Sequence, residues 1–244
     1  MTTFALKPYQ QTALDTLSAF VQAAQVKGAT LAFRELVGRP YQADAFGPTP
    51  CVCLRIPTGG GKTLLAAKAI PLLAAQWRAS DAPVVVWLVP SDAIRAQTLK
   101  GLQTPGHPYR EVLTDQYGDG LHVCALEDVA QIAPPDWGRK AVVVVATIQS
   151  FRIDDTDKRN VYSFSESFER HFKAAEAEQP RALAALRELP DAVVTAEEAE
   201  QDGRAILRGH IGQPRQSLTN WLALHEPIVI VDEAYVDFGS QSAL

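Results

Sequence analysis

The 244-residue chain is predicted to be an α/β protein, with a mostly parallel sheet that carries helices on both faces. Three short apolar runs support this prediction: VVVWLV (84–89), AVVVVA (141–146) and IVIV (228–231). Unbroken, largely β-branched runs of this length are typical of strands that are buried on both faces, as parallel strands are. Segments with helical patterns separate the runs, and strands that alternate with helices favour a parallel sheet.

Weaker elements complete the pattern. CVCLRI (51–56) and LHVCAL (121–126) are predicted to be further strands. Apolar residues at helical spacing predict a helix over 8–27, which Gly28 should end. Two further helices, TLLAAKAI and AIRAQTLKGL, should follow strands, and Pro71 should kink or end the first of them.

Residues from about 154 to 215 break this rhythm of strands and helices. The segment is rich in Ala, Glu and Arg, includes the predicted helix RALAALREL (181–189) and contains no apolar strand. Between 154 and 203 the acids outnumber the bases about two to one, so the acidity behind the net charge of −5 is concentrated here. We expect a helical, acidic insertion in a single domain that covers 1–244. The rest of the chain is nearly balanced in charge, which leaves room for a local DNA-binding track.

Composition favours the cytoplasm as the location. The apolar runs are far shorter than the roughly 20 residues that span a bilayer, and the N-terminal MTTFALKPYQQ lacks the basic and apolar regions of a secretion signal. We therefore expect no membrane partner. Cys51 and Cys53 should point to the same side of a strand, as small buried residues in a reducing compartment, and their spacing does not indicate a metal site.

The strongest motif is IPTGGGKT (56–63), in which a predicted strand leads into three glycines before Lys62 and Thr63 begin a helix. Glycines let the backbone curl so that successive N–H groups point at phosphate oxygens, and the helix N-terminus adds positive potential. We expect Lys62 to bridge the β- and γ-phosphates and the Thr63 hydroxyl to ligate Mg²⁺. The phosphate loop itself consists of Thr58, Gly59, Gly60 and Gly61. An ordinary glycine turn is the alternative, and Ile56 stands where the common pattern begins with Gly or Ala.

A second motif follows the last apolar run. Asp232 and Glu233 come directly after IVIV, at the carboxyl end of a strand, where ligands of open α/β sheets bind. Asp232 is expected to hold Mg²⁺ through its water shell, and Glu233 to polarise the attacking water. An acid pair after a strand would by itself indicate only surface acids. Together with the phosphate loop, it predicts a nucleotide hydrolase site.

PTGGGKT and DEAY together resemble motifs I and II of superfamily 2 helicases and translocases, in which the second motif is often DEAD or DEAH. The resemblance implies a RecA-like P-loop NTPase domain that uses ATP and Mg²⁺. Tyr235 takes the place of the family's Asp or His. In the family that residue helps to link ATP to the rest of the motor, so the departure puts this coupling in question.

An upstream segment, LKPYQ (6–10), is similar to the family's LRPYQ element. The resemblance implies that Gln10 reads adenine and that Tyr9 lies beside the ring. The alternative interpretation makes Gln10 merely an exposed residue of the first helical turn.

Two later segments are similar to motifs that contact nucleic acid. VVVWLVPSDAIRAQTL resembles motif Ia, which implies that Ser91 and Arg95 contact phosphates. VVVVATIQSF resembles motif Ic, which implies that Thr147 and Gln149 also face the nucleic acid. The alternatives are a solvated helix residue for Arg95 and a capped strand end for Thr147 and Gln149.

Within the superfamily, VWLVPSDAIRAQTL, ATIQSFRIDD and SLTNWLALHEPIVIVDEA are most similar to the Res subunits of type III restriction enzymes. This resemblance covers nearly the whole chain, and it implies DNA, double-stranded DNA in particular, as the partner. A modification methyltransferase subunit would be a second partner. Motif III, a second RecA-like domain and a nuclease domain are expected to be absent, so the sheet should be incomplete after 228–231. In this fold class the missing strand lies between 51–56 and 228–231, so these two should face each other across an empty position unless they close up or another chain fills it.

The best-supported function is therefore that of an ATP-binding and ATP-hydrolysing N-terminal domain of a DNA helicase or translocase of the Res kind. As a truncated fragment it is expected to have little or no motor activity alone. One alternative is a non-catalytic module that binds nucleotide or a partner, and the acidic insertion favours this alternative. A small-molecule kinase is the other, but it explains neither PSDAIRAQT nor ATIQSF.

Overall fold

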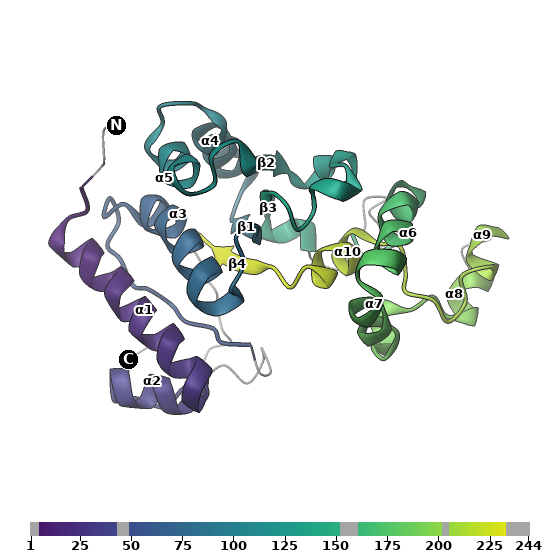
Figure 1. The fold of residues 1–244 in the computed structure, drawn as a ribbon, viewed down its shortest axis with the longest axis horizontal. Coiled ribbons are helices and arrows are strands. Elements are labelled where there is room, and N and C mark those ends of the chain that lie inside the picture. The colour runs from purple at the N-terminus through teal and green to yellow at the C-terminus, as the bar shows by residue number, and fades with distance from the viewer. Residues whose placement is uncertain (1–4, 43–48, 152–160, 202–204, 233–244) are drawn as a thin grey trace.

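The computed structural model describes residues 5–42, 49–151, 161–201 and 205–232 (Figure 1). A four-stranded parallel sheet forms its centre, with the strand order β2–β3–β1–β4. The strands are β1 (Val84–Val89), β2 (Leu121–Ala125), β3 (Ala141–Thr147) and β4 (Ile228–Val231). The predicted α/β class with a parallel sheet is confirmed.

Helices cover both faces of the sheet, as predicted (Figure 1). One face packs against α3 (Lys62–Leu73), α4 (Asp92–Gln103) and α5 (Pro108–Tyr117). The other packs against α6 (Glu169–Glu178), α7 (Pro180–Arg187) and α10 (Leu218–Leu224). Alternate side chains of the inner strands serve the two layers because successive residues of a strand point to opposite faces. Toward α3–α5 lie Val85, Trp87, Val143 and Val145, and toward α6, α7 and α10 lie Val84, Val86, Val142 and Val144.

The N-terminal helix α1 (Pro8–Lys27) has the predicted bounds and ends at Gly28, whose φ of 81° suits a residue without a side chain. A short helix that the sequence pattern did not predict, α2 (Ala29–Val37), follows it. The apolar stripe of α1 packs against α3 in a separate core. Its buried members are Leu14, Leu17, Phe20, Val21 and Ala24.

The predicted strand over 51–56 is not formed: this segment has no regular secondary structure. Val52, Leu54 and Ile56 pack against the core between α1 and α3, while Cys53 is exposed, so the prediction of two buried cysteines is also wrong. Among the described residues, no strand pairs with this segment. Because this segment has no neighbouring strand to pair with, its alternating apolar residues pack against helices and it does not join the sheet.

The last strand lies at the outer edge of the described sheet, with β1 as its neighbour. Val229 and Val231 are 56% and 41% exposed, so the prediction that this run is buried on both faces is wrong. Among the described residues, the segment 51–56 does not pair with β4, and whether a position between them is empty stays a prediction.

Pro71 was expected to kink or end its helix. Helix α3 does not end there but continues to Leu73 and into an irregular π-helical turn, η2 (Ala74–Arg78). Proline lacks the N–H group that would bond to the carbonyl one turn earlier, which disfavours a regular helix at this point. Ile70 and Ala74, on either side of Pro71, are both buried against the sheet. Their burial holds the segment helical through the proline, and an irregular turn follows.

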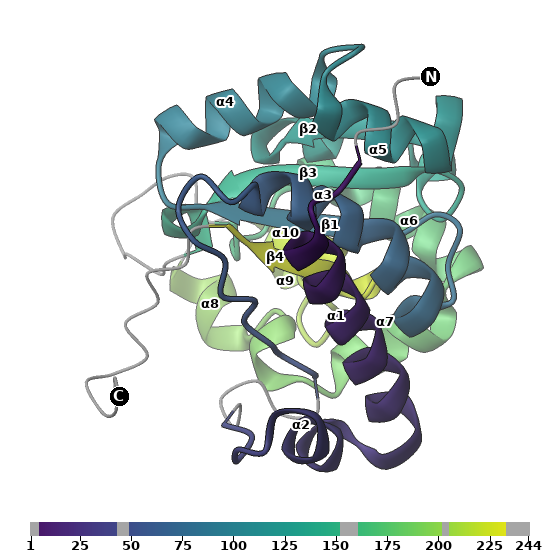
Figure 2. The ribbon, with the colours of Figure 1, turned by 90° about the vertical axis from the view of Figure 1, so that its left-hand side faces the viewer.

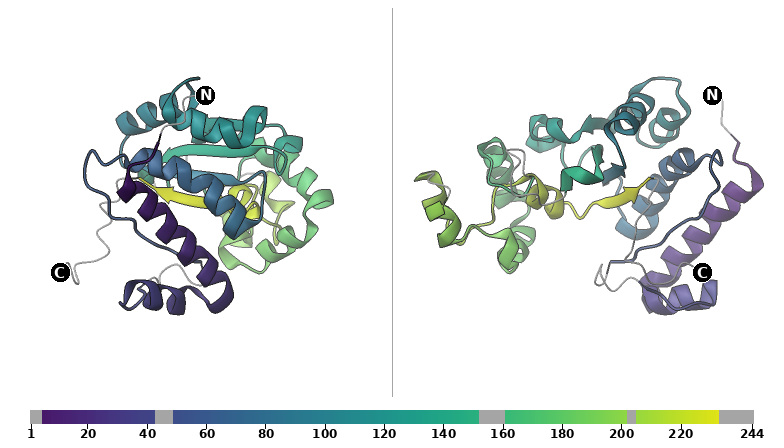
Figure 3. Two further views of the ribbon diagram at one scale, coloured as in Figure 1. Left: turned by 60° about the vertical axis from the view of Figure 1, so that its left-hand side comes forward. Right: turned by 180° about the vertical axis from the view of Figure 1, so that it is seen from behind.

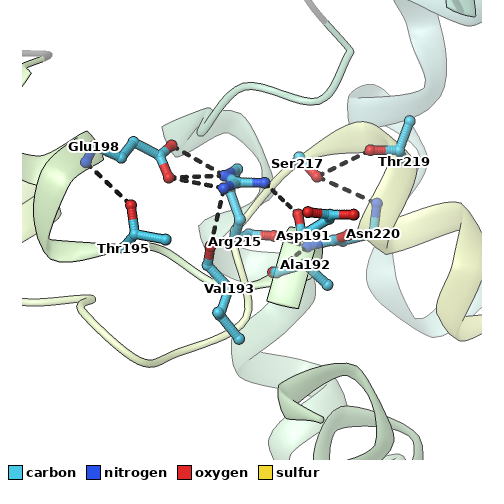
Figure 4. A network of polar contacts seen from close by, with 9 residues as sticks. All are labelled: Asp191, Ala192, Val193, Thr195, Glu198, Arg215, Ser217, Thr219 and Asn220. Atoms are coloured by element: carbon cyan, nitrogen blue, oxygen red, sulfur yellow. Dashed lines mark hydrogen bonds and ion pairs between the residues drawn. The ribbon is translucent and has the colours of Figure 1, made fainter. Parts of the chain in front are cut away.

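Residues 161–217 are mostly helical and include α8 (Ala196–Gln201) and α9 (Ala205–Arg208). A small core of Phe164, Val194, Ala199 and Leu207 holds part of the segment together. Figure 4 shows the Arg215 guanidinium at the centre of a polar network: it contacts the Glu198 carboxylate at 2.8 Å and donates to the carbonyls of Asp191 at 2.7 Å and Val193 at 2.9 Å. This bidentate pair and its carbonyl contacts tie two distant stretches of the segment together.

None of the helices in the described ranges is both long and apolar enough to cross a membrane.

Candidate nucleotide-binding site

The phosphate loop lies between the extended segment 51–56 and the start of α3. A tight turn forms where the Gly60 N–H donates to the Pro57 carbonyl at 2.9 Å. Gly59 and Gly61 have φ values of 75° and 77°, in the left-handed region that favours glycine. Gly61 is the N-cap of α3, so Lys62 and Thr63 occupy the first two helical positions, as the motif predicted.

Two of the glycines are also required by close neighbours. A Cβ atom at Gly60 would lie 2.7 Å from Cγ2 of Ile56, and one at Gly61 would lie 2.6 Å from Nε2 of Gln10. At Gly60 the Pro57 carbonyl oxygen would also lie 2.8 Å from the Cβ atom, so the loop itself would have to shift. At Gly61 the Gln10 amide would have to move, and the positive φ already disfavours a side chain. The loop is therefore built from bare backbone, as a loop that wraps phosphate oxygens with N–H groups must be.

The N-termini of α3 and α4 differ in a way that bears on anion binding. At α4, the Ser91 Oγ accepts from the Ile94 N–H at 3.4 Å, and Asp92 places an acid in the first turn. At α3, the N-cap is Gly61, which has no side chain with which to cap the helix, and the first turn carries no acid. The α3 N-terminus therefore offers the positive end of its dipole to an anion such as phosphate.

The start of α1 touches the phosphate loop directly. Nε2 of Gln10 donates to the Gly60 carbonyl at 2.8 Å, and the Tyr9 hydroxyl donates to the same oxygen at 2.9 Å. The Gln10 Oε1 accepts from the Lys7 N–H at 2.9 Å. Gln10 is only 6% exposed, so the interpretation of it as an exposed first-turn residue is wrong. Adenine recognition by Gln10 and Tyr9 stays a prediction.

Asp232 follows β4 directly and is buried. Its backbone N–H donates to the Leu88 carbonyl at 2.9 Å, which continues the β1–β4 ladder by one residue and fixes the backbone that carries the carboxylate. Figure 2 shows the phosphate loop, the start of α4 and the ends of β3 and β4 on the same side of the molecule. Glu233 and Tyr235 lie outside the described residues, so their predicted roles have no structural counterpart here.

The residues predicted to contact nucleic acid lie at or just after the carboxyl ends of β1 and β3, which are adjacent. Nε2 of Gln149 donates to the Pro90 carbonyl at 3.1 Å, which links the turn after β3 to the turn that carries Ser91. The Thr147 side chain is buried, and its hydroxyl lies 2.9 Å from the Ser150 hydroxyl. This contact is what the interpretation of a capped strand end predicts for Thr147, whereas Gln149 and Ser91 are exposed.

Arg95 is held by two acids. Its guanidinium contacts Glu127 at 2.9 Å and Asp92 at 3.1 Å, and the hydrogen bond to Glu127 is the main reason why the pKa of Arg95 is raised. Arg95 is therefore not simply a solvated helix residue. The role of Glu127, which follows β2, was missed from the sequence because only the parallel packing of β2 beside β3 brings it toward α4.

Figure 3 shows, from two further sides, that α1, the phosphate loop and α3 form one flank of the molecule and that α6–α9 form the opposite end. The phosphate loop is thus remote from α6–α9. We therefore assign the Arg215 network to the structure of that segment and not to the site.

The comparison with protein families identifies the family described as "Type III restriction enzyme, res subunit", which matches residues 3–234. Comparisons with curated proteins and with solved structures find no match. The family match spans nearly the whole chain, including the phosphate loop, the start of α1 and the acid after β4. The four-stranded parallel sheet with helices on both faces agrees with the RecA-like P-loop fold of that family. The chain belongs to the type III restriction enzyme res-subunit family.

Proposed function

We propose that this chain binds ATP with Mg²⁺ and hydrolyses it as the N-terminal RecA-like ATPase domain of a DNA helicase or translocase. The observation that carries the proposal is the start of α3. There a bare glycine loop leads into a helix that has neither a side-chain cap nor a first-turn acid, with Lys62 and Thr63 at its first two positions. Such a helix start is suited to polyanionic phosphate.

Each residue of the site has a proposed role. Lys62 and the loop N–H groups bind the phosphates, and Thr63 and Asp232 hold Mg²⁺, which offsets the negative charge of the phosphates. Gln10 and Tyr9 recognise the adenine end. Glu233 orients or deprotonates the attacking water.

DNA, and double-stranded DNA in particular, is the proposed partner of the surface after β1 and β3. Ser91 and Gln149 are exposed there, and the Gln149 contact to Pro90 holds the two turns together. Arg95 reaches a DNA phosphate only if it exchanges Glu127 and Asp92 for that phosphate. A modification methyltransferase subunit is proposed as a second partner on the strength of the family alone.

Replacing Lys62 tests the nucleotide site. We expect Lys62→Ala to weaken Mg²⁺-ATP binding by about ten- to a hundredfold, because a charge-assisted contact to phosphate is lost. Lys68→Ala is the matched control: it removes the same charge from α3 nearly two turns further along the helix. Titration of both variants and the wild type with a fluorescent ATP analogue, checked by calorimetry, gives the affinities.

Equal affinities for the wild type and Lys62→Ala would refute the proposed nucleotide site, as would a wild type that does not bind ATP. Hydrolysis is measured separately, as phosphate release with and without double-stranded DNA. Binding without phosphate release under both conditions would instead support a non-catalytic nucleotide-binding module.

A further inference from the structure

The Gly60 carbonyl is the point at which α1 holds the phosphate loop. Two side-chain donors converge on its oxygen, the Tyr9 hydroxyl at 2.9 Å and Nε2 of Gln10 at 2.8 Å. A carbonyl oxygen has two lone pairs, so these two contacts use its full capacity as an acceptor. The donors come from about 50 residues earlier in the chain, so this is a tertiary contact and not a local feature of the turn.

The contact determines which way the next N–H group points. A peptide unit is planar and trans, so the carbonyl of one residue and the N–H of the next point in opposite directions. The Gly60 carbonyl points to α1, and the Gly61 N–H in the same peptide unit therefore points away from α1. Gly61 is the N-cap of α3, at the positive end of that helix.

Glycine by itself would not keep this orientation. Without a Cβ atom, the peptide between Gly60 and Gly61 has more accessible backbone conformations than any other residue pair would allow. If it turned over, the carbonyl dipole instead of the N–H would face the bound phosphates. A fixed orientation reduces the entropy that the loop loses when it binds its ligand.

We propose that the Tyr9 hydroxyl positions the phosphate loop. It holds the Gly60 carbonyl toward α1, and the Gly61 N–H therefore points toward the phosphate. This inference rests on the proposed function, because it concerns how the same loop binds its ligand. It gives Tyr9 a role distinct from contact with adenine. It also makes the docking of α1 against the loop a condition for tight phosphate binding.

Tyr9 allows a cleaner test than Gln10. Gln10 is buried and also accepts from the Lys7 N–H, so replacing it would disturb the start of α1 as well. Tyr9 is 42% exposed, and Tyr9→Phe removes the hydroxyl while it keeps the ring. The matched control is Tyr162→Phe, which removes another tyrosine hydroxyl that donates to a backbone carbonyl, that of Phe151, at 2.9 Å.

The experiment measures the binding of Mg²⁺-ATP and of inorganic tripolyphosphate, a probe that has phosphates but no adenine. We expect Tyr9→Phe to weaken both ligands by the same factor, about three- to tenfold, which corresponds to one neutral hydrogen bond. Tyr162→Phe should bind both like the wild type. The thermal midpoints of both variants should stay close to that of the wild type, so that a general loss of structure is excluded.

Wild-type affinity of Tyr9→Phe for both ligands would overturn the proposal, because the hydroxyl would then contribute nothing. Weaker binding of ATP with unchanged binding of tripolyphosphate would also overturn it, since the hydroxyl would then act on the nucleoside. Failure of the wild type to bind either ligand would instead refute the proposed nucleotide site, which Lys62→Ala tests independently.

Discussion

Strands β3 and β4 are made of similar residues and lie in very different surroundings. β3 reads AVVVVAT and has neighbours on both sides, and all seven of its residues are buried. β4 reads IVIV and has β1 on one side, and Val229 and Val231 are substantially exposed. An unbroken β-branched run thus predicts a strand reliably, but its burial depends on which elements lie beside it.

The two strands can be compared residue by residue, because both pair with β1. Val144 of β3 and Val229 of β4 are both in register with Val86, on either side of it. Val144 is completely buried, whereas Val229 is 56% exposed. The same substitution at these two positions therefore isolates the effect of position in the sheet.

An aspartate at each position should give the largest difference. Val144→Asp places a carboxyl group in the apolar core between the sheet and α6, α7 and α10, and we expect it to lower the free energy of unfolding by more than about 4 kcal/mol. Val229→Asp should lower it by about 1 kcal/mol or less, because the carboxylate can stay in water. Urea unfolding followed by circular dichroism measures both. Similar losses in the two variants would show that β4 is covered in solution.

Acidification should weaken a contact that the two strands share. The Trp137 ring, just before β3, stacks on the His225 ring, just before β4, with centroids 4.8 Å apart and planes at 22°. Burial, and to a smaller extent the nearby His171, lowers the pKa of His225 to about 4. The unfolded chain therefore binds a proton near pH 6.5 that the folded chain takes up only near pH 4.

Because of this difference, neutral His225 contributes its full share to the free energy of unfolding above about pH 6.5. The contribution decreases as the pH falls toward 4. The loss is about 2–3 kcal/mol. His225→Phe keeps an aromatic ring and removes the titration, so its stability should fall less between pH 7 and 4 than that of the wild type. The unfolding free energy of both proteins is measured across this range, and the difference between them removes the effect of the titratable groups that they share. Parallel curves would refute the role of His225.

The smallest expected effect on stability is that of Val229→Lys, which should change the free energy of unfolding by no more than about 0.5 kcal/mol. Its effect should appear in self-association instead, because an apolar strand edge pairs readily with another chain and a lysine there opposes such pairing. Sedimentation velocity over a range of concentrations compares this variant with the wild type. A wild type that stays monomeric at all concentrations would show that the β4 edge does not mediate self-association.

The periodic parts of the fold were predictable from the sequence. The α1 stripe and the runs of β1 and β3 depend on local patterns of burial, and the structure has these elements close to their predicted bounds. The segment 51–56 also alternates apolar and polar residues, but a strand needs a neighbour to pair with, and no sequence window shows whether one exists. Pro71 does not end its helix for a related reason: the burial of Ile70 and Ala74 outweighs the local preference of proline.

The site was predictable to the extent that its residues lie in short motifs. IPTGGGKT implied the start of α3 and its bare glycine loop, both of which the structure has. The long-range contacts were not predictable, because each joins segments that only the fold brings together. The partners of Arg95 are one case, and the convergence of Tyr9 and Gln10 on Gly60 is another.

The pairing of β1 with β4 has a consequence for the order in which the chain folds. Val85 is in register with Ile228, so this ladder joins segments that leave the ribosome at very different times. The ladders between β1, β3 and β2 need only residues up to Thr147, and α1 can dock on the phosphate loop earlier still. Because long-range parallel pairing is slow and forms late, a nascent chain has its phosphate loop well before it has Asp232. Of the residues of the proposed site, the two acids after β4, Asp232 and Glu233, are therefore the last to be synthesised.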